Sequence, residues 1–178
     1  MAKRTIPKLK DYFQAGKRPT EDQFEDVFDS FIHLDNPDYI KTEDWGSTRE
    51  GILKFFTYEH SATNIFHIKL PYRADTDHAM FYLKATGYNY SQGDIIDVTW
   101  VGYCYKPDGN VINHKSHVAI SAIITAGQYV GSDSHVYIWL KLPNTYFSTF
   151  KIDSMHVGNG RLLKQGDLEI IVSDLNQL

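Results

Sequence analysis

The chain has 178 residues, of which 42% are hydrophobic and 22% are charged, and its net charge is −4 at pH 7. These values are those of one ordinary globular domain, or of one domain with an appendage, and they favour neither a nucleic-acid partner nor an anionic membrane. No apolar segment follows the opening Met-Ala-Lys-Arg, and no run approaches the roughly 18 apolar residues that a membrane span needs. We therefore expect neither a secretory signal nor membrane insertion.

The start of the chain predicts a helical hairpin. Residues 7–15 suit a short helix that stops at Gly16. After the break GKRP, Thr20 suits the N-cap of a second helix, and Gln23 three positions on completes a capping box. This helix ends before Pro37, because proline disfavours helical geometry at the residue that precedes it.

The second predicted helix has one apolar face. Phe24, Val27, Phe28 and Phe31 recur at i, i+3, i+4 and i+7, which places them on a single stripe. A helix of about 12 residues is marginal alone in water, and burial of each large apolar side chain contributes roughly 1.5–3 kcal/mol. The stripe therefore needs a partner surface. The pattern leaves two alternatives open: the chain's own β domain or first helix, and another protein.

Residues 35–50 are polar and follow neither helical nor strand periodicity, so we expect a linker there. From residue 51 onward, apolar residues alternate with period two, and turn sequences such as SQGD, KPDGN, AGQYVGSDS and GNGR separate the runs. PDGN is the strongest hairpin signal. The strand candidates are ILKFFTY, IFHIKL, AMFYLKATGYNY, IIDVTWVGYCYK, HVAISAIIT, HVYIWLKL, YFSTFKIDSMHV and LEIIVS. This pattern predicts a mainly β domain, a β-sandwich of jelly-roll-like topology.

Two of these strand candidates carry apolar side chains on both faces. HVYIWLKL alternates aliphatic residues with two aromatic ones, and IIDVTWVGYCY is apolar on both sides. A sandwich strand in a monomer usually has one dry face and one polar face, so the second face needs a cover, either the N-terminal arm or a neighbouring subunit. We therefore expect a homo-oligomer. Its interface is predicted to include five aromatic residues: Trp100, Tyr103, Tyr105, Tyr137 and Trp139.

The sequence contains no recognisable catalytic motif. It has no G-x-S-x-G elbow, no P-loop, no G-x-G-x-x-G and no H-E-x-x-H. His114 and His117 are three positions apart, so on a strand they point to opposite faces and cannot easily share a metal. Cys104 lies in a strand-like segment and is expected to be a buried thiol without an activating base. We expect no enzyme activity, no catalytic residue, no cofactor and no bound metal.

The turn GYNYSQGD offers the best platform for a sugar. Tyrosine rings can stack on the C–H faces of a sugar while amides bind its hydroxyl groups, which makes Tyr88, Asn89 and Tyr90 candidate glycan contacts. The alternative for the same cluster is an aromatic-rich strand end that packs at a subunit interface.

The segment YFQAGKRPTEDQFEDVFDSFIH, residues 12–33, resembles the N-terminal segment of structural proteins of tailed bacteriophages, especially crAss-like and related phages of Bacteroidetes-type hosts. Residues 64–172 are similar, in the order and spacing of short aromatic and glycine blocks, to tail-fibre and virion-appendage domains. The chain departs from long fibres because it has no collagen-like tract and no heptad run. The N-terminal matches are Phe13, Gly16, Lys17, Pro19, Thr20, Phe24, Asp26, Asp29, Ser30, Phe31 and His33.

The resemblance implies a non-enzymatic virion protein with an N-terminal anchoring arm at 1–34, a linker at 35–50 and a β-sandwich head at 51–178. The head would form a homotrimer on the phage tail or appendage, with other virion proteins and a host surface glycan as partners. A stand-alone carbohydrate-binding β-sandwich is the alternative function. The arm would dock on a virion protein through seven residues: Tyr12, Phe13, Lys17, Arg18, Phe24, Phe28 and Phe31.

Overall fold

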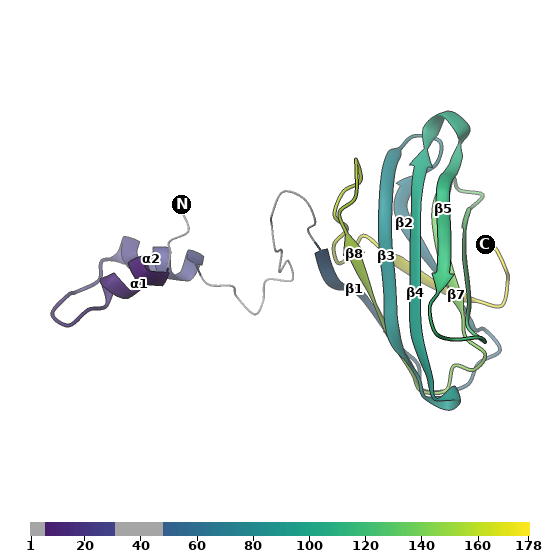
Figure 1. The fold of residues 1–178 in the computed structure, drawn as a ribbon, viewed down its shortest axis with the longest axis horizontal. Coiled ribbons are helices and arrows are strands. Elements are labelled where there is room, and N and C mark those ends of the chain that lie inside the picture. The colour runs from purple at the N-terminus through teal and green to yellow at the C-terminus, as the bar shows by residue number, and fades with distance from the viewer. Residues whose placement is uncertain (1–5, 31–47) are drawn as a thin grey trace. The chain divides into compact units, whose positions relative to one another are not determined.

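The computed structural model describes residues 6–30 and 48–178, which belong to two separate units, one helical and one β (Figure 1). The helical unit contains α1 (Ile6–Tyr12) and α2 (Glu21–Ser30). The β unit contains all the described strands. Neither described helix has the length and apolar character to cross a membrane.

The predicted capping box forms at the start of α2. The Thr20 amide donates to Oε1 of Gln23 at 3.1 Å, and the Gln23 amide donates to the Thr20 hydroxyl oxygen at 3.4 Å. Gly16 has φ +85°, a conformation that glycine adopts without steric cost, and it lies in the turn between the helices. The first helix ends at Tyr12, about one turn earlier than predicted.

The strands of the β unit form two antiparallel sheets that stack face to face (Figure 1). The first sheet has the order β1 (Thr48–Phe56), β8 (Ser148–Met155), β3 (His78–Asn89), β4 (Asp94–Tyr105) and β5 (Asn110–Val118). The second sheet has the order β6 (Thr125–Val130), β7 (His135–Lys141), β2 (Ile65–Arg73) and β9 (Glu169–Ser173). The predicted β-sandwich is confirmed, whereas its jelly-roll topology stays a prediction.

The structure shows how two of the predicted turns are formed and where the predicted linker ends. The KPDGN hairpin forms between β4 and β5, where η2 (Lys106–Asp108) leads into Gly109 with φ +59°. The β3–β4 turn is built in the same way from η1 (Tyr90–Gln92). β1 begins at Thr48, so residues 48–50 of the predicted linker belong to a strand, and residues 35–47 lie outside the described part of the chain.

The predicted strand HVAISAIIT is wrong in its middle. β5 ends at Val118 and β6 begins at Thr125, while the connecting segment leaves Ile120 61% exposed. Ser121 provides a local reason, because its hydroxyl oxygen accepts hydrogen bonds from the amides of Ile123 and Ile124. Such side-chain bonds compete with a sheet ladder. β6 instead lies in AGQYVGSDS, which was predicted to be a turn.

The core lies between the sheets, and Trp100 links them. Its side chain is completely buried, and Nε1 donates to the Gly127 carbonyl at 3.0 Å, from β4 in one sheet to β6 in the other. A second such link runs from the side-chain Nε2 of Gln128, which donates to the Val101 carbonyl at 3.1 Å. The largest fully buried side chains are Trp100, Phe66, Ile65, Ile68, Leu70, Leu83, Ile96, Ile138, Leu140, Leu142, Ile152 and Leu163.

The chain's own C-terminal residues cover part of the outer face of the β6-β7-β2-β9 sheet. His67 points to this face, yet it is completely buried. Its Nε2 lies 3.0 Å from the Leu175 carbonyl and its Nδ1 lies 3.0 Å from the Tyr129 hydroxyl, which also accepts the Leu178 amide at 3.1 Å. A neutral ring with its proton on Nε2 satisfies every one of these bonds. The sequence prediction considered only the N-terminal arm or a neighbouring subunit as a cover.

This arrangement predicts a stability that depends on His67. Burial lowers the pKa of His67 from its ordinary value of 6.5, and this outweighs the opposite effect of the hydrogen bond to Leu175. The unfolded chain therefore binds a proton near pH 6.5 that the folded chain does not, so stability falls as the pH drops from 6.5 toward the lower folded pKa. We expect the free energy of unfolding, measured with urea, to fall between about pH 7.5 and pH 5.5.

A His67→Gln variant tests this origin because glutamine does not titrate. Its loss of stability over the same pH interval is expected to be smaller than that of the unmodified chain. His117→Gln, which replaces an exposed histidine of β5, is the control and is expected to keep the full loss. Equal pH dependence in the unmodified chain and in His67→Gln would contradict the account.

Candidate functional site

The predicted interface residue Trp100 is not at a surface. It lies on the inner face of β4 and is 0% exposed in the single chain, so the prediction that it contacts a neighbouring subunit was wrong. The reason is that β4 alternates between core and outer face, and Trp100 shares the core side with Val98 and Cys104.

The other four predicted interface residues lie on two opposite faces of the sandwich. Tyr103 and Tyr105 are partly exposed on the outer face of β4, with ring centroids 5.3 Å apart. Tyr137 and Trp139 lie on the outer face of β7. Tyr137 is only 5% exposed because its ring stacks on Tyr129 at 5.1 Å, so it has little surface for a partner. No single flat contact contains all four residues.

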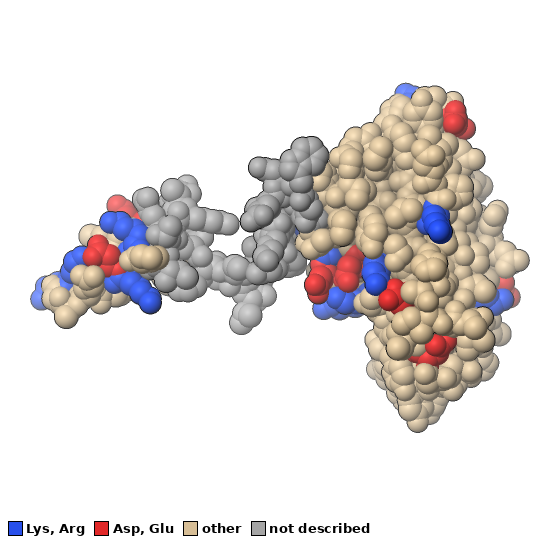
Figure 2. Space-filling view, viewed as in Figure 1, with Lys and Arg blue, Asp and Glu red and all other residues tan. Residues whose placement is uncertain are grey.

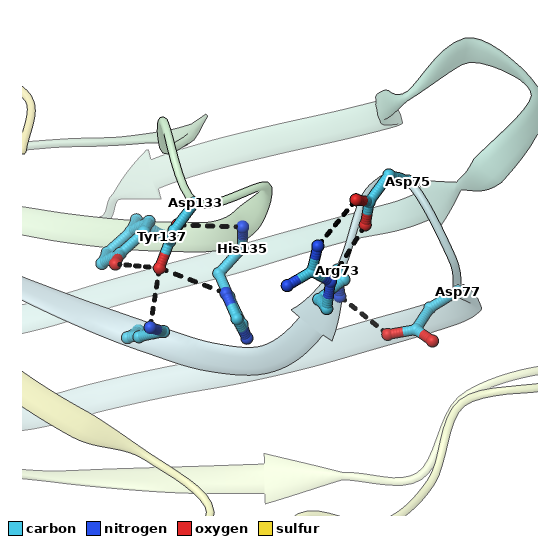
Figure 3. A network of polar contacts seen from close by, with 7 residues as sticks. Arg73, Asp75, Asp77, Asp133, His135 and Tyr137 are labelled. Atoms are coloured by element: carbon cyan, nitrogen blue, oxygen red, sulfur yellow. Dashed lines mark hydrogen bonds and ion pairs between the residues drawn. The ribbon is translucent and has the colours of Figure 1, made fainter.

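A polar network surrounds Asp133 in the turn between β6 and β7 (Figure 3). Its carboxylate lies 2.7 Å from Lys69 Nζ and 3.1 Å from His135 Nδ1, and it accepts bonds from the Tyr137 hydroxyl at 3.0 Å and from the His135 amide at 3.1 Å. Burial acts to raise the pKa of Asp133, but these hydrogen bonds outweigh it and hold the pKa well below its usual range. The network fixes a tight turn.

The neighbouring turn after β2 is closed in the same manner (Figure 3). The Arg73 guanidinium forms a bidentate ion pair with the Asp75 carboxylate, with N–O distances of 2.7 and 3.1 Å. The backbone amide of Arg73 donates to the Asp77 carboxylate at 2.7 Å. Within residues 6–30 and 48–178 no group of three or more histidine, cysteine or acidic side chains is placed to hold a metal ion. The Cys104 thiol is buried, as predicted, and burial raises its pKa to about 11, which disfavours a nucleophilic thiolate.

Six exposed aromatic side chains gather at the end of the β unit where η1 lies, and we call them the apical aromatic surface. They come from the end of β1 and the two residues after it, from the end of β3 and the β3–β4 turn, and from the segment before β8. Their exposed fractions run from 40% for Phe147 to 67% for Tyr58. Figure 2 shows this end of the β unit mostly in tan. The six residues are Phe56, Tyr58, Tyr88, Tyr90, Tyr146 and Phe147.

The rings of the apical aromatic surface contact one another. Phe56 and Tyr58 meet edge to face at 4.7 Å, and so do Tyr146 and Phe147. Tyr90 lies 6.2 Å from both Tyr146 and Phe147, and Phe147 lies 6.1 Å from Phe56. Tyr88 joins through Tyr90 at 6.4 Å. Edge-to-face contact is a favoured geometry for aromatic pairs, so the surface is continuous and internally stabilised.

Asn89 holds this surface from beneath and is not itself a contact residue. It is completely buried, and its side-chain amide donates to the Asn144 carbonyl at 2.9 Å. The prediction that Asn89 touches a glycan was therefore wrong, because the strand alternation that exposes Tyr88 and Tyr90 turns Asn89 inward. Tyr88 and Tyr90 are exposed, and a glycan contact by them stays a prediction.

The loop that carries Tyr146 and Phe147 is fixed by further contacts. The Tyr90 amide donates to the Phe147 carbonyl at 3.2 Å, and the Ser148 amide donates to the Thr57 hydroxyl oxygen at 3.0 Å. Phe147 has φ +47°, a conformation that costs of order 1–3 kcal/mol for a residue other than glycine. The chain thus keeps a strained phenylalanine in an exposed position.

The helical unit has a second exposed aromatic region. Tyr12, a predicted docking residue, is only 6% exposed, and its hydroxyl donates to Asp26 at 2.9 Å, so it joins the two helices and does not project. Phe13 and Phe24 meet edge to face at 5.6 Å while they remain 51% and 44% exposed. Phe28 is 59% exposed.

The remaining predicted docking residues differ in their surroundings. Lys17 pairs with Asp11 at 2.7 Å, and both side chains are largely exposed. Arg18 is exposed in the turn between the helices. Phe31 lies outside the described residues.

Comparison of the chain with protein-family models, with curated proteins and with solved structures found no match. The two exposed aromatic regions are therefore the features on which a function can be proposed.

The role of Asn89 in supporting the apical aromatic surface can be tested by substitution. An Asn89→Asp substitution keeps the shape of the side chain but replaces its donor with a buried carboxylate. We expect a loss of about 2–4 kcal/mol in the free energy of unfolding at neutral pH, measured by urea titration. Asn110→Asp is the matched control, because that exposed side chain accepts a bond from the Val111 amide and the carboxylate keeps this role. Equal stability of the two variants would show that Asn89 has no supporting role.

Proposed function

We propose that this chain is a non-enzymatic structural protein of a tailed-bacteriophage virion, in which the helical hairpin anchors a β-sandwich head on the tail or an appendage. The observation that carries the proposal is the phenylalanine pair Phe13 and Phe24, which the helical unit itself leaves about half exposed. The resemblance of residues 12–33 to the N-terminal segments of phage structural proteins supports the same role.

The size of the helical unit supports docking. α1 has seven residues and α2 has ten, lengths at which helices are marginal in water without packing. Tyr12 and its bond to Asp26 close the hairpin, but the rings of Phe13 and Phe24 remain about half exposed. Burial of these rings on a partner would supply the missing apolar contacts. Lys17 and Arg18, in the turn between the helices, would lie at the polar rim of such a contact.

The head is proposed to assemble as a homotrimer. A cyclic trimer joins two different surfaces of the same chain, oriented so that three copies close a ring. The partly exposed aromatic rings available for such contacts are those of Tyr103, Tyr105 and Trp139. A sedimentation mass of three chains supports this part of the proposal, and a mass of one chain contradicts it.

A stand-alone carbohydrate-binding module is the second candidate function, and the apical aromatic surface is the observation that favours it. The helical unit separates the two candidates. A stand-alone module is expected to bind its ligand without the helical unit. A virion component is expected to fail to assemble without it.

Deletion of residues 1–45 tests the anchoring role. β1 begins at Thr48, so the truncated chain retains every strand of the sandwich and is expected to stay folded and soluble. It is expected to be missing from particles of a phage that encodes the chain, as judged by mass spectrometry of purified virions. Unfolding of the truncated chain, or its normal incorporation, would contradict the proposal.

A matched pair of point variants locates the contact. Phe24→Ser removes an exposed ring from α2 and is expected to reduce incorporation several-fold. Glu25→Ser changes the next exposed residue of the same helix and is expected to incorporate normally. Equal incorporation of both variants would place the contact elsewhere.

A further inference from the structure

The apical aromatic surface is large for an exposed apolar region. An aromatic side chain has about 150–250 Å² of surface, so six that are roughly half exposed leave about 600 Å² in contact with water. This is at the upper end of the largest patches on typical monomers, and such patches are often functional. Its strained Phe147 and its buried support at Asn89 show that the fold holds these rings in place.

The charge around this surface argues against an anionic ligand. Residues 56–60, 87–96 and 143–149, which supply the six rings and the turns that carry them, contain no lysine and no arginine. Lys54 on β1 and Lys151 on β8 lie two positions along the strands from Phe56 and Thr149, and Lys151 is paired with Glu50 and Asp153. The acidic residues of the three segments are Glu59, which is exposed, and Asp94, whose carboxylate accepts a bond from the Ser121 hydroxyl. Aromatic platforms for single-stranded nucleic acid are combined with a basic groove, which these segments lack. A neutral ligand fits the surface better.

The area also argues against a second copy of the chain. A stable protein–protein contact buries about 800 Å² on each partner, more than the roughly 600 Å² that the six rings offer. The surface lies at one end of the sandwich and not on a broad sheet face, so flat protein surface does not extend it.

We propose that the apical aromatic surface is a binding site for a neutral glycan. The face of an aromatic ring carries a partial negative charge, which attracts the C–H groups on the face of a sugar ring. Tyr58, Tyr88, Tyr90 and Tyr146 add hydroxyl groups that exchange hydrogen bonds with sugar hydroxyls. The rings are 4.7–6.4 Å apart and tilted against each other, so they present faces in several directions to an extended chain of sugars.

The biological role of this site rests on the proposed virion function, in which the head faces the host. The binding itself does not depend on assembly, because every residue of the site belongs to the β unit. The two proposals can therefore fail separately. A chain that binds a neutral glycan but never joins particles overturns the virion role alone, and a chain that joins particles but binds no neutral glycan overturns the inference drawn here.

The test uses the full chain on an array of neutral oligosaccharides, acidic oligosaccharides and proline-rich peptides, followed by calorimetric titration with the best neutral probe. Tyr90→Ala and Tyr146→Ala are each expected to weaken binding about tenfold, the effect of losing one stacked ring. Tyr82→Ala is the control, because it removes a partly exposed tyrosine from the outer face of β3, six residues before Tyr88 in the sequence. Urea titration checks that each variant is folded.

Binding of a neutral oligosaccharide that the two apical variants weaken and the control retains would support the proposal. Three results would overturn it: no neutral oligosaccharide bound, binding that Tyr90→Ala leaves unchanged, or a preference for acidic glycans or proline-rich peptides. Self-association that Tyr90→Ala abolishes, without glycan binding, would instead assign the surface to a second copy of the chain and would also overturn it.

Discussion

The hydrogen bond from the Trp100 indole to the Gly127 carbonyl is the contact that aligns the two sheets, since it joins a completely buried ring on β4 of one sheet to β6 of the other. Position 127 has to be glycine for this arrangement, because a Cβ there would lie 2.7 Å from the ring of Trp139, which covers the strand from outside. Gly127 is thus held between two tryptophans. An unpaired indole N–H on the completely buried Trp100 would cost about 1–3 kcal/mol, so the pairing strongly favours one alignment of the sheets.

The register within the sheets places the aromatic rings. Phe56 on β1 and Tyr88 on β3 both pair with Thr149 of β8, one from each side, which brings them to the same end of the sheet. The β3–β4 turn and the segment before β8 then bring Tyr90 and Phe147 alongside. The apical aromatic surface is therefore a consequence of strand order. In the helical unit, Tyr12 has the opposite role, since it closes the hairpin and leaves the phenylalanines outside. In both units, buried side chains leave a group of aromatic rings exposed.

Local patterns in the sequence predicted the parts of the fold that local physics decides. The capping box at Thr20, the PDGN hairpin and the placement of Val136, Ile138 and Leu140 on one face of their strand are confirmed because each depends on neighbouring residues alone. The errors arose where distant residues meet. His67 is buried by residues more than 100 positions away, and Phe56, Tyr58, Tyr146 and Phe147 were missed as partners of Tyr90 because only strand order brings them together. The density of aromatic residues in FFTY and TYFSTF was the one available signal.

The central claim is that the two aromatic regions face different partners, the hairpin toward the virion and the apical surface toward the host. Electron cryo-microscopy of particles from a phage that encodes this chain tests it most directly. The account predicts three copies around one axis, with α1 and α2 buried against another virion protein and Tyr90 and Tyr146 at the solvent-exposed end. Density that shows the helical unit free in solvent, or the apical aromatic surface buried against the virion, would contradict it.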